Sequence, residues 1–219
     1  MVDKLATHDA ELVCVIVNNG LGGRICHRAK QLGVLGVTIT LGMGTSTGKF
    51  LDILTLRDVR KEVVFMIARK DVAQMALDQI HKEHDFDKPN HGIAFTSTVI
   101  GAVGSKWYKE LEMDDEKGDD IMYHLITVIV EKGRGEDAVE AATEAGSNGG
   151  TILNARGAGV HETQKVFGID IEPEKEVIMI ISERTKTEPI ITAIRQRLDM
   201  GKPGHGIIYV QNVNKVYGF

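Results

Sequence analysis

Two short, similar segments hold residue types that could bind an anion. The first is Lys88-Pro89-Asn90-His91-Gly92, and the second runs from Gly201 through Lys202-Pro203 to Gly206. Glycine lets backbone N–H groups approach an anion closely, and successive amides of a turn form a concave nest for it. Lysine adds positive charge and histidine adds a hydrogen-bond donor. The expected anion-binding residues are therefore Lys88, His91, Gly92, Gly201, Lys202, Gly204, His205 and Gly206.

A tight helix-to-strand turn is the alternative interpretation of these segments. A turn needs glycine and proline, but it does not need histidine. Lysine and histidine both recur in the two segments. The two interpretations therefore stay open.

Two long segments, at residues 42–60 and 156–175, form a second candidate site. Loops longer than about 12 residues without their own structure are usually functional. The glycines at the base of each loop, Gly44 and Gly157, could contact a phosphorylated ligand together with Thr45. The apolar middle of each loop is also consistent with an extension of the flanking strands.

The sequence offers few groups of residues that could form the active site of an enzyme. His81 and His84 have a spacing that could ligate a metal, but no third ligand is evident. Cys14 lies in an apolar run and Cys26 in a helical pattern, so both are interpreted as structural. No pair of a nucleophile and a base can be assigned, and we expect no catalytic residue and no metal site.

Composition excludes several classes of protein. The chain has 219 residues, of which 42% are hydrophobic and 26% are charged, and its net charge is −5. These values are typical of a globular protein without the basic footprint of nucleic-acid binding. No stretch reaches the ~20 apolar residues that span a bilayer. With two cysteines and no pattern of a signal peptide, the sequence predicts a cytoplasmic protein without membrane insertion.

The chain contains an internal duplication. LVCVIV at residues 12–17 aligns with LITVIV at 125–130, an offset of 113, and several glycines match at the same offset. Beyond the long loop the offset becomes 114, which aligns Glu62 with Glu176 and KPNHGI with KPGHGI. We predict a first repeat at 11–104, an acidic linker at 105–123 and a second repeat at 124–219.

Each repeat shows the same order of expected elements. Apolar, β-branched runs predict strands at 12–17, 37–41, 62–68 and 91–98, and at 125–130, 151–155, 176–182 and 205–213. Helical spacing of apolar residues predicts helices at 24–32, 71–84, 136–145 and 190–198. The order βαββαβ predicts an α+β chain of two tandem ferredoxin-like domains, each a four-stranded antiparallel sheet with two helices on one face.

Signals at the helix ends support these expected helices. Gly33 is expected to end the first helix, and Asp71 to cap the second. Thr185 and Glu188 have the spacing of a capping box, which places Pro189 in the first turn of the last helix.

The sequence resembles the nitrogen-regulatory PII signalling family. The resemblance lies in the glycine-bearing segments after the second strand, VTITLGMGT and TILNARGAG, and in GKPGHGII before the fourth strand. Gly201, Lys202, Gly204 and Gly206 match the family's phosphate-binding loop, and Thr38 and Thr151 match a threonine of the second strand. The loop departs from the family at His205, where an aspartate is usual, and at Ile207, which replaces a lysine.

The resemblance implies a non-enzymatic regulator. It implies a trimer that binds an adenine nucleotide, ATP, ADP or AMP, between subunits, and that docks onto a target protein through the long loops. No cofactor would be required. The alternative is a protein that binds a metal or another anion on the same fold, similar to the divalent-cation-tolerance proteins.

Overall fold

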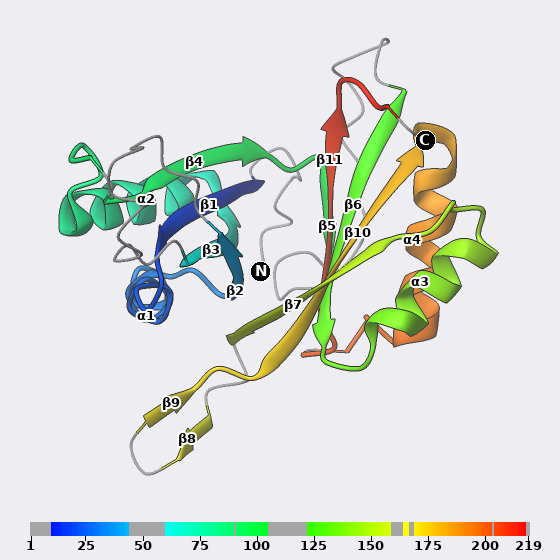
Figure 1. Cartoon of the computed structure of the whole chain (residues 1–219). Coiled ribbons are helices and arrows are strands. Elements are labelled where there is room, and N and C mark those ends of the chain that lie inside the picture. Colours follow the sequence, from blue (N-terminus) through cyan, green and yellow to red (C-terminus); the bar gives the residue numbers. More distant parts are fainter. Residues whose placement is uncertain are drawn as a thin grey trace, which may run out of the picture. The chain divides into compact units, whose positions relative to one another are not determined.

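A computed structural model describes residues 10–43, 60–89, 91–104, 122–158, 164–166, 169–202 and 204–217 (Figure 1). The chain divides into two compact units. Residues 11–97 form the N-terminal unit, and residue 10 with residues 98–219 forms the C-terminal unit. None of the helices described in these ranges is long and apolar enough to cross a membrane.

The N-terminal unit has the predicted βαββαβ order. It contains β1 (Ala10–Asn18), α1 (Gly22–Gln31), β2 (Val37–Met43), β3 (Arg60–Arg69), α2 (Lys70–His84) and β4 (Ile93–Thr98). The strands are ordered β4-β1-β3-β2, and β2 pairs antiparallel with β3 from Val37 opposite Met66 to Met43 opposite Arg60. This order confirms the ferredoxin-like arrangement.

The C-terminal unit repeats this order. It contains β6 (Tyr123–Glu131), α3 (Gly135–Glu144), β7 (Thr151–Ala158), β10 (Glu174–Glu183), α4 (Arg184–Leu198) and β11 (Ile207–Val213). Its strands are ordered β7-β10-β6-β11, the same order as in the N-terminal unit. Both α3 and α4 lie on one face of this sheet (Figure 1). Two further short strands, β8 (Gln164–Val166) and β9 (Ile169–Ile171), pair as a hairpin between β7 and β10.

One strand extends the sheet of the C-terminal unit beyond the fourth strand. The strand β5 (Gly101–Val103) follows β4 in sequence and pairs antiparallel with β11. The structure therefore groups residues 98–104 with the C-terminal unit, although the first repeat was expected to run to residue 104. The limits of the repeats and of the linker at 105–123 stay predictions, and residues 105–121 lie outside the described residues.

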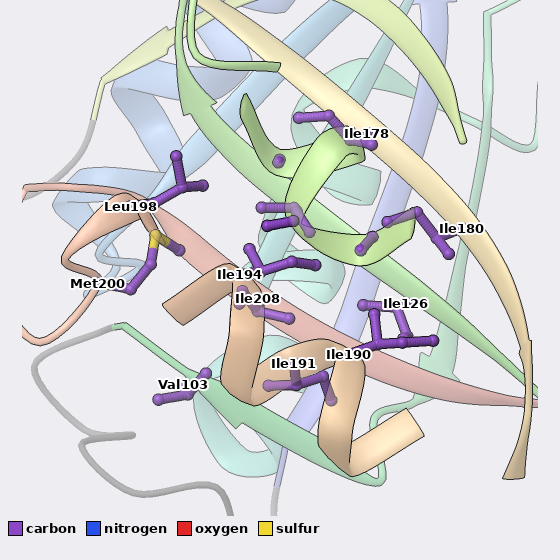
Figure 2. Packing of buried hydrophobic residues seen from close by; sticks show 14 of the residues in the cluster. Val103, Ile126, Ile178, Ile180, Ile190, Ile191, Ile194, Leu198, Met200 and Ile208 are labelled. Carbon is purple, nitrogen blue, oxygen red and sulfur yellow. The ribbon is translucent and has the colours of Figure 1, made fainter. Parts of the chain in front are cut away.

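Each unit has its own apolar core between its sheet and its two helices. In the C-terminal unit, Ile190, Ile191 and Ile194 of α4 face the strands (Figure 2), and the buried cluster includes Ile126, Ile178, Ile180, Ile208 and Val103. In the N-terminal unit, Ile25 and Ile80 of the helices pack with alternating residues of β1 and β3. Because such burial contributes about 1.5–3 kcal/mol per large aliphatic side chain, these cores are the main source of stability.

A glutamate carboxylate joins sheet and helix in the same way in both units, buried in the N-terminal unit and half-buried in the C-terminal unit. In the N-terminal unit, Glu62 of β3 is 2% exposed and accepts a hydrogen bond of 2.6 Å from the backbone N–H of Gly22, at the start of α1. In the C-terminal unit, Glu176 of β10 accepts the equivalent bond of 2.7 Å from Gly135, at the start of α3. Negative charge is favourable at a helix N-terminus, where backbone N–H groups lack partners within the helix.

Helix ends depart from two of the sequence predictions. Asp71 is not the cap of α2, because the helix begins at Lys70 and its N-cap residue is Arg69. The capping box of Thr185 and Glu188 was also wrong, since α4 begins at Arg184 and Pro189 lies inside the helix, after its first turn. Both helices follow directly from an extended strand, so neither N-cap side chain makes a capping hydrogen bond. Gly33, with φ of 95°, directly follows the C-cap residue of α1, as predicted.

A substitution of the glycine at the start of α1 should destabilise the fold. A Cβ on Gly22 would lie 2.7 Å from Glu62 Oε2 and 3.1 Å from Ile39 Cγ2, so Gly22→Ala must displace the capping carboxylate. We expect a loss of about 1–3 kcal/mol in the free energy of unfolding, measured by urea denaturation. Gly36→Ala is the matched control, because a Cβ there meets nothing within 4 Å. Equal denaturation midpoints for the two variants would contradict the prediction.

Candidate functional site

The two KPxHGI segments have equivalent positions in the two units. Each follows the second helix and precedes the fourth strand, β4 or β11. In the C-terminal unit, Gly201, Lys202 and Gly204 are exposed, and His205 and Gly206 are partly buried. Asn90 and Pro203 lie outside the described residues. The segments are therefore surface loops whose backbone is open to a ligand from solution.

The histidine of each segment caps the helix that precedes it. The Nδ1 of His91 lies 2.9 Å from the carbonyl oxygen of His84, the last residue of α2. The Nδ1 of His205 lies 3.3 Å from the carbonyl oxygen of Leu198, the last residue of α4. Because a carbonyl oxygen only accepts, each ring nitrogen donates its proton to an end of a helix that lacks an internal partner. This contact is a structural reason for histidine at these positions.

The lysine of each segment pairs with an aspartate three residues earlier. Lys88 Nζ lies 2.7 Å from Asp85, and Lys202 forms the equivalent pair with Asp199. The lysine hydrogen bond lowers the pKa of each aspartate below its ordinary value. Both aspartates adopt the left-handed conformation that ends the helix, with φ of 52° and 53°. An incoming phosphate would have to share the lysine with this carboxylate.

Two glycines in these segments permit close packing against the neighbouring strand. A Cβ on Gly206 would lie 2.4 Å from the carbonyl oxygen of Ile129, and one on Gly92 would lie 2.9 Å from that of Ile16. Gly204 differs, because a Cβ there meets nothing within 4 Å, while its φ is +88°. Gly206 is thus required by packing, and Gly204 by the conformation of the loop.

The base of the long loop lies at the same end of the sheet as the KPxHGI segment. The N–H of Gly157 donates to Pro173 at 3.0 Å, beside the start of β10. Glu174 of β10 in turn pairs with Lys132, just beyond β6, with an oxygen–nitrogen distance of 2.9 Å. Since Gly206 packs beside Ile129 of β6, the two candidate segments of this unit share one end of the sheet. Gly44 and Thr45 lie outside the described residues.

The two candidate segments nevertheless lie at opposite edges of that end. In each unit the KPxHGI segment precedes one outer strand, β4 or β11, and the long loop follows the other outer strand, β2 or β7. Two strands lie between these outer strands. Three strand spacings correspond to about 14 Å. Thr38 and Thr151 are also remote from the loop ends, since Thr151 lies six residues before Gly157 in β7, or about 20 Å along an extended strand. One repeat alone does not bring all the predicted residues together.

A depression in the C-terminal unit has the wrong charge for an anion. It measures about 500 Å³ and lies between α3 and the start of β7, with Glu136, Asp137, Val139, Glu140, Gly150 and Ile152 as its lining. Three of these six residues are acidic, and carboxylates repel phosphate. This depression is therefore not a candidate for the nucleotide.

Metal and thiol chemistry find no support in the described part of the chain. No group of three or more His, Cys, Asp or Glu side chains there could hold a metal ion. The Nε2 atom of His81 lies 3.3 Å from a carboxylate oxygen of Asp87. Among the described residues, His81 and His84 belong to no group of three or more possible metal ligands. Both cysteines are buried, and burial raises the pKa of the Cys14 thiol to about 11, as suits an inert structural residue.

Sequence reasoning missed the interactions that shape this end of the sheet. Glu62 and Glu176 were noted only as a match between repeats, although they anchor the helices beside the candidate loops. The Arg156–Glu172 pair at the base of the β8–β9 hairpin, with a nitrogen–oxygen distance of 2.5 Å, was not singled out either. The recurrence of this glycine and this glutamate in both repeats, at offsets of 113 and 114, was the signal that could have identified the first interaction.

A family model agrees with the resemblance seen in the sequence of the second repeat. Residues 123–219 match the family model Nitrogen regulatory protein P-II. Among solved structures, a Bacillus subtilis GlnK–ATP complex matches with 19% identity and a TM-score of 0.35, over 42% of this chain and 83% of that chain. The PII protein of Arabidopsis thaliana bound to citrate matches with 24% identity and a TM-score of 0.35, over 43% and 79%. No curated protein matches the sequence significantly.

The contribution of the Lys202–Asp199 pair to stability should depend on pH. A lowered pKa in the folded protein means that the pair contributes stability above the ordinary pKa of aspartate, and that this stability is lost as the pH falls through the folded pKa. In Lys202→Ala, the pKa of Asp199 should rise toward its ordinary value of 3.8, as measured by NMR titration of the carboxyl group. Lys88→Ala should move the pKa of Asp85 and leave that of Asp199 unchanged. An unchanged pKa of Asp199 in Lys202→Ala would show that the pair does not form in solution.

Proposed function

We propose that the chain is a regulatory protein that senses an adenine nucleotide and docks onto a target protein, because its residues 123–219 match the P-II family. The observation that carries this proposal is the P-II family match over residues 123–219, which spans the complete loop from Gly201 to Gly206. We infer no catalytic role, because a sensor needs only a site whose occupancy changes the shape of a docking loop.

Backbone amides would provide most of the phosphate contacts. Gly201, Lys202 and Gly204 are exposed, and the φ of +88° at Gly204 belongs to the turn conformations that aim successive N–H groups at one point. The helix cap made by His205 holds the loop at a fixed place beyond α4. Lys202 then supplies the positive charge, in exchange for part of its contact with Asp199.

A complete site would combine segments from two repeats. Because the KPxHGI segment and the base of the long loop occupy opposite edges of one sheet, a ligand of nucleotide size touches both only where the edges of two repeats come together. The PII resemblance implies sites between subunits, and the geometry of the single repeat supports that interpretation. We accordingly propose a homo-oligomer, a trimer by the same resemblance.

The hairpin of the long loop is the proposed docking element of the second repeat. Strands β8 and β9 pair antiparallel, from Gln164 opposite Ile171 to Val166 opposite Ile169. They project beyond the ends of β7 and β10, away from α3 and α4 (Figure 1). The strand content agrees with the interpretation that the apolar middle of the loop is extended. The corresponding loop of the first repeat lies outside the described residues.

A nucleotide titration tests the ligand. We expect ATP, ADP or AMP to bind, as measured by calorimetry, and Lys202→Ala to weaken binding by roughly ten- to a hundredfold, because a charge-assisted hydrogen bond contributes about 1.5–3 kcal/mol. Lys186→Ala is the matched control, since Lys186 pairs with Glu183 at the same i,i+3 spacing but lies near the opposite end of α4. The control should bind like the unchanged protein. No binding of any of the three nucleotides, or equal losses in both variants, would overturn the ligand proposal.

Sedimentation equilibrium tests the assembly independently. We expect a species of three times the 24.0 kDa mass of one chain at micromolar concentration. A stable monomer under these conditions would reject the trimer, whatever the result of the nucleotide titration.

A further inference from the structure

The fourth strand of the N-terminal unit forms an edge with apolar side chains on its surface. In the order β4-β1-β3-β2, no strand lies beyond β4 among the described residues of that unit. Ile93 is 63% exposed and Phe95 is 47% exposed, and their alternation places both on one face. Edge strands present backbone hydrogen-bonding groups to a partner, and exposed apolar side chains favour such pairing.

The equivalent edge of the C-terminal unit is occupied. There, β5 pairs with β11 in the register Val103 opposite Ile208, Ala102 opposite Tyr209 and Gly101 opposite Val210. Val103 is 1% exposed and belongs to the core of this unit. The segment that follows β4 thus completes the sheet of the next repeat along the chain.

The segment that follows β11 matches β5 in sequence. At the offset of 114, Gly101-Ala-Val-Gly104 aligns with Lys215-Val-Tyr-Gly218, so an apolar pair followed by glycine recurs. Residues 215–217 belong to no strand in the structure, and Tyr217 is 82% exposed. The chain therefore carries a second segment of the β5 type that does not occupy a sheet edge.

The glycines at the end of the β5–β11 pairing extend this match. In the C-terminal unit, a Cβ on Gly104 would lie 2.5 Å from the carbonyl oxygen of Gly206, so this close approach requires glycine after the added strand. The equivalents of these two residues are Gly218 and Gly92, which are both glycine. Gly218 lies outside the described residues, and only its identity enters the argument. Sequence thus retains the glycine that the same pairing would need at β4.

We propose that residues 215–217 of a second copy of this chain add to β4 as an antiparallel strand. The register of β5 on β11, shifted by 114 residues, places Tyr217 opposite Ala94, Val216 opposite Phe95 and Lys215 opposite Thr96. The first repeat then donates its trailing segment to the second repeat, and the second repeat donates its own to the first repeat of another copy. Such head-to-tail contacts close into a ring when the rotation between copies permits it.

Side-chain sizes agree with this register. Ile208 and Val103 share one position of the observed ladder, whereas the proposed ladder combines the small Ala94 with the larger Tyr217. Ala94 packs at the border of the N-terminal core, where an added Tyr217 ring would cover apolar surface. On the other face, Val216 would cover part of Phe95. Backbone pairing supplies affinity, and these alternate side chains supply register, as in other cases of strand addition.

A disulfide trap tests the partner and the register together. Directly opposed residues of an antiparallel pair have Cα atoms about 4.5–5.5 Å apart, within the range that a disulfide spans. The double variant Ala94→Cys/Tyr217→Cys, oxidised with glutathione disulfide, should form covalent oligomers on a non-reducing gel. Ile93→Cys/Tyr217→Cys is the out-of-register control, because Ile93 is one residue away and faces the opposite side. We expect several-fold more cross-linked product from the first variant than from the control.

Every other outcome overturns the proposal. Covalently closed monomers would show that the chain's own terminal segment occupies β4, and equal cross-linking of the two variants would show that no defined register exists. A chain lacking residues 215–219 gives a second measurement, since its oligomer mass should fall while its circular dichroism stays the same. An unchanged mass would exclude the strand exchange. Because none of these readouts contains a nucleotide, failure here is distinct from failure of the proposed ligand.

Discussion

A glutamate that accepts the first N–H of a helix, buried in the N-terminal unit and half-buried in the C-terminal unit, is the constraint on which each repeat depends. Glu62 and Glu176 reach from the third strand of their sheets to Gly22 and Gly135, at 2.6 and 2.7 Å. A carboxylate in such a position must be hydrogen-bonded, because burying it without a partner costs several kcal/mol. The bond therefore fixes where the first helix starts, and the glycine leaves the space that the carboxylate needs. The candidate loops lie at this same end of the sheet.

The repeated histidine shows how a structural role and a binding role can occupy one loop. His91 and His205 donate to the last carbonyl groups of α2 and α4, so their recurrence follows from the need to end a helix. The same contact holds the loop in one conformation before any ligand arrives. Preorganised amides lose less conformational entropy on binding, so a helix cap of this kind also favours anion binding.

An ion pair joins the two helices of each unit, with reversed polarity in the two units. In the N-terminal unit, Arg28 of α1 contacts Glu83 of α2 at 2.8 Å. In the C-terminal unit, the residue equivalent to Glu83 is Arg197, and it contacts Glu140 and Glu144 of α3 at 2.9 and 2.7 Å. Each exposed pair contributes little stability. Exchange of helices between repeats would bring like charges together, so the reversal favours pairing within a repeat.

The duplicated βαββαβ order could be predicted from the sequence alone, because apolar runs and glycines recur at nearly constant offset and their periodicity reports strands and helices directly. The KPxHGI segments were also identified from the sequence, which could not distinguish a structural turn from an anion-binding site.

That their histidines cap helices became visible only in the tertiary structure, because the contact joins residues whose distance depends on the packed loop. Helix starts at Lys70 and Arg184 likewise followed from strands that continue directly into helices, against the local capping signals. The position of β5 on β11 could not be read from the sequence, because pairing between strands far apart in the chain depends on which sheet edge is left open.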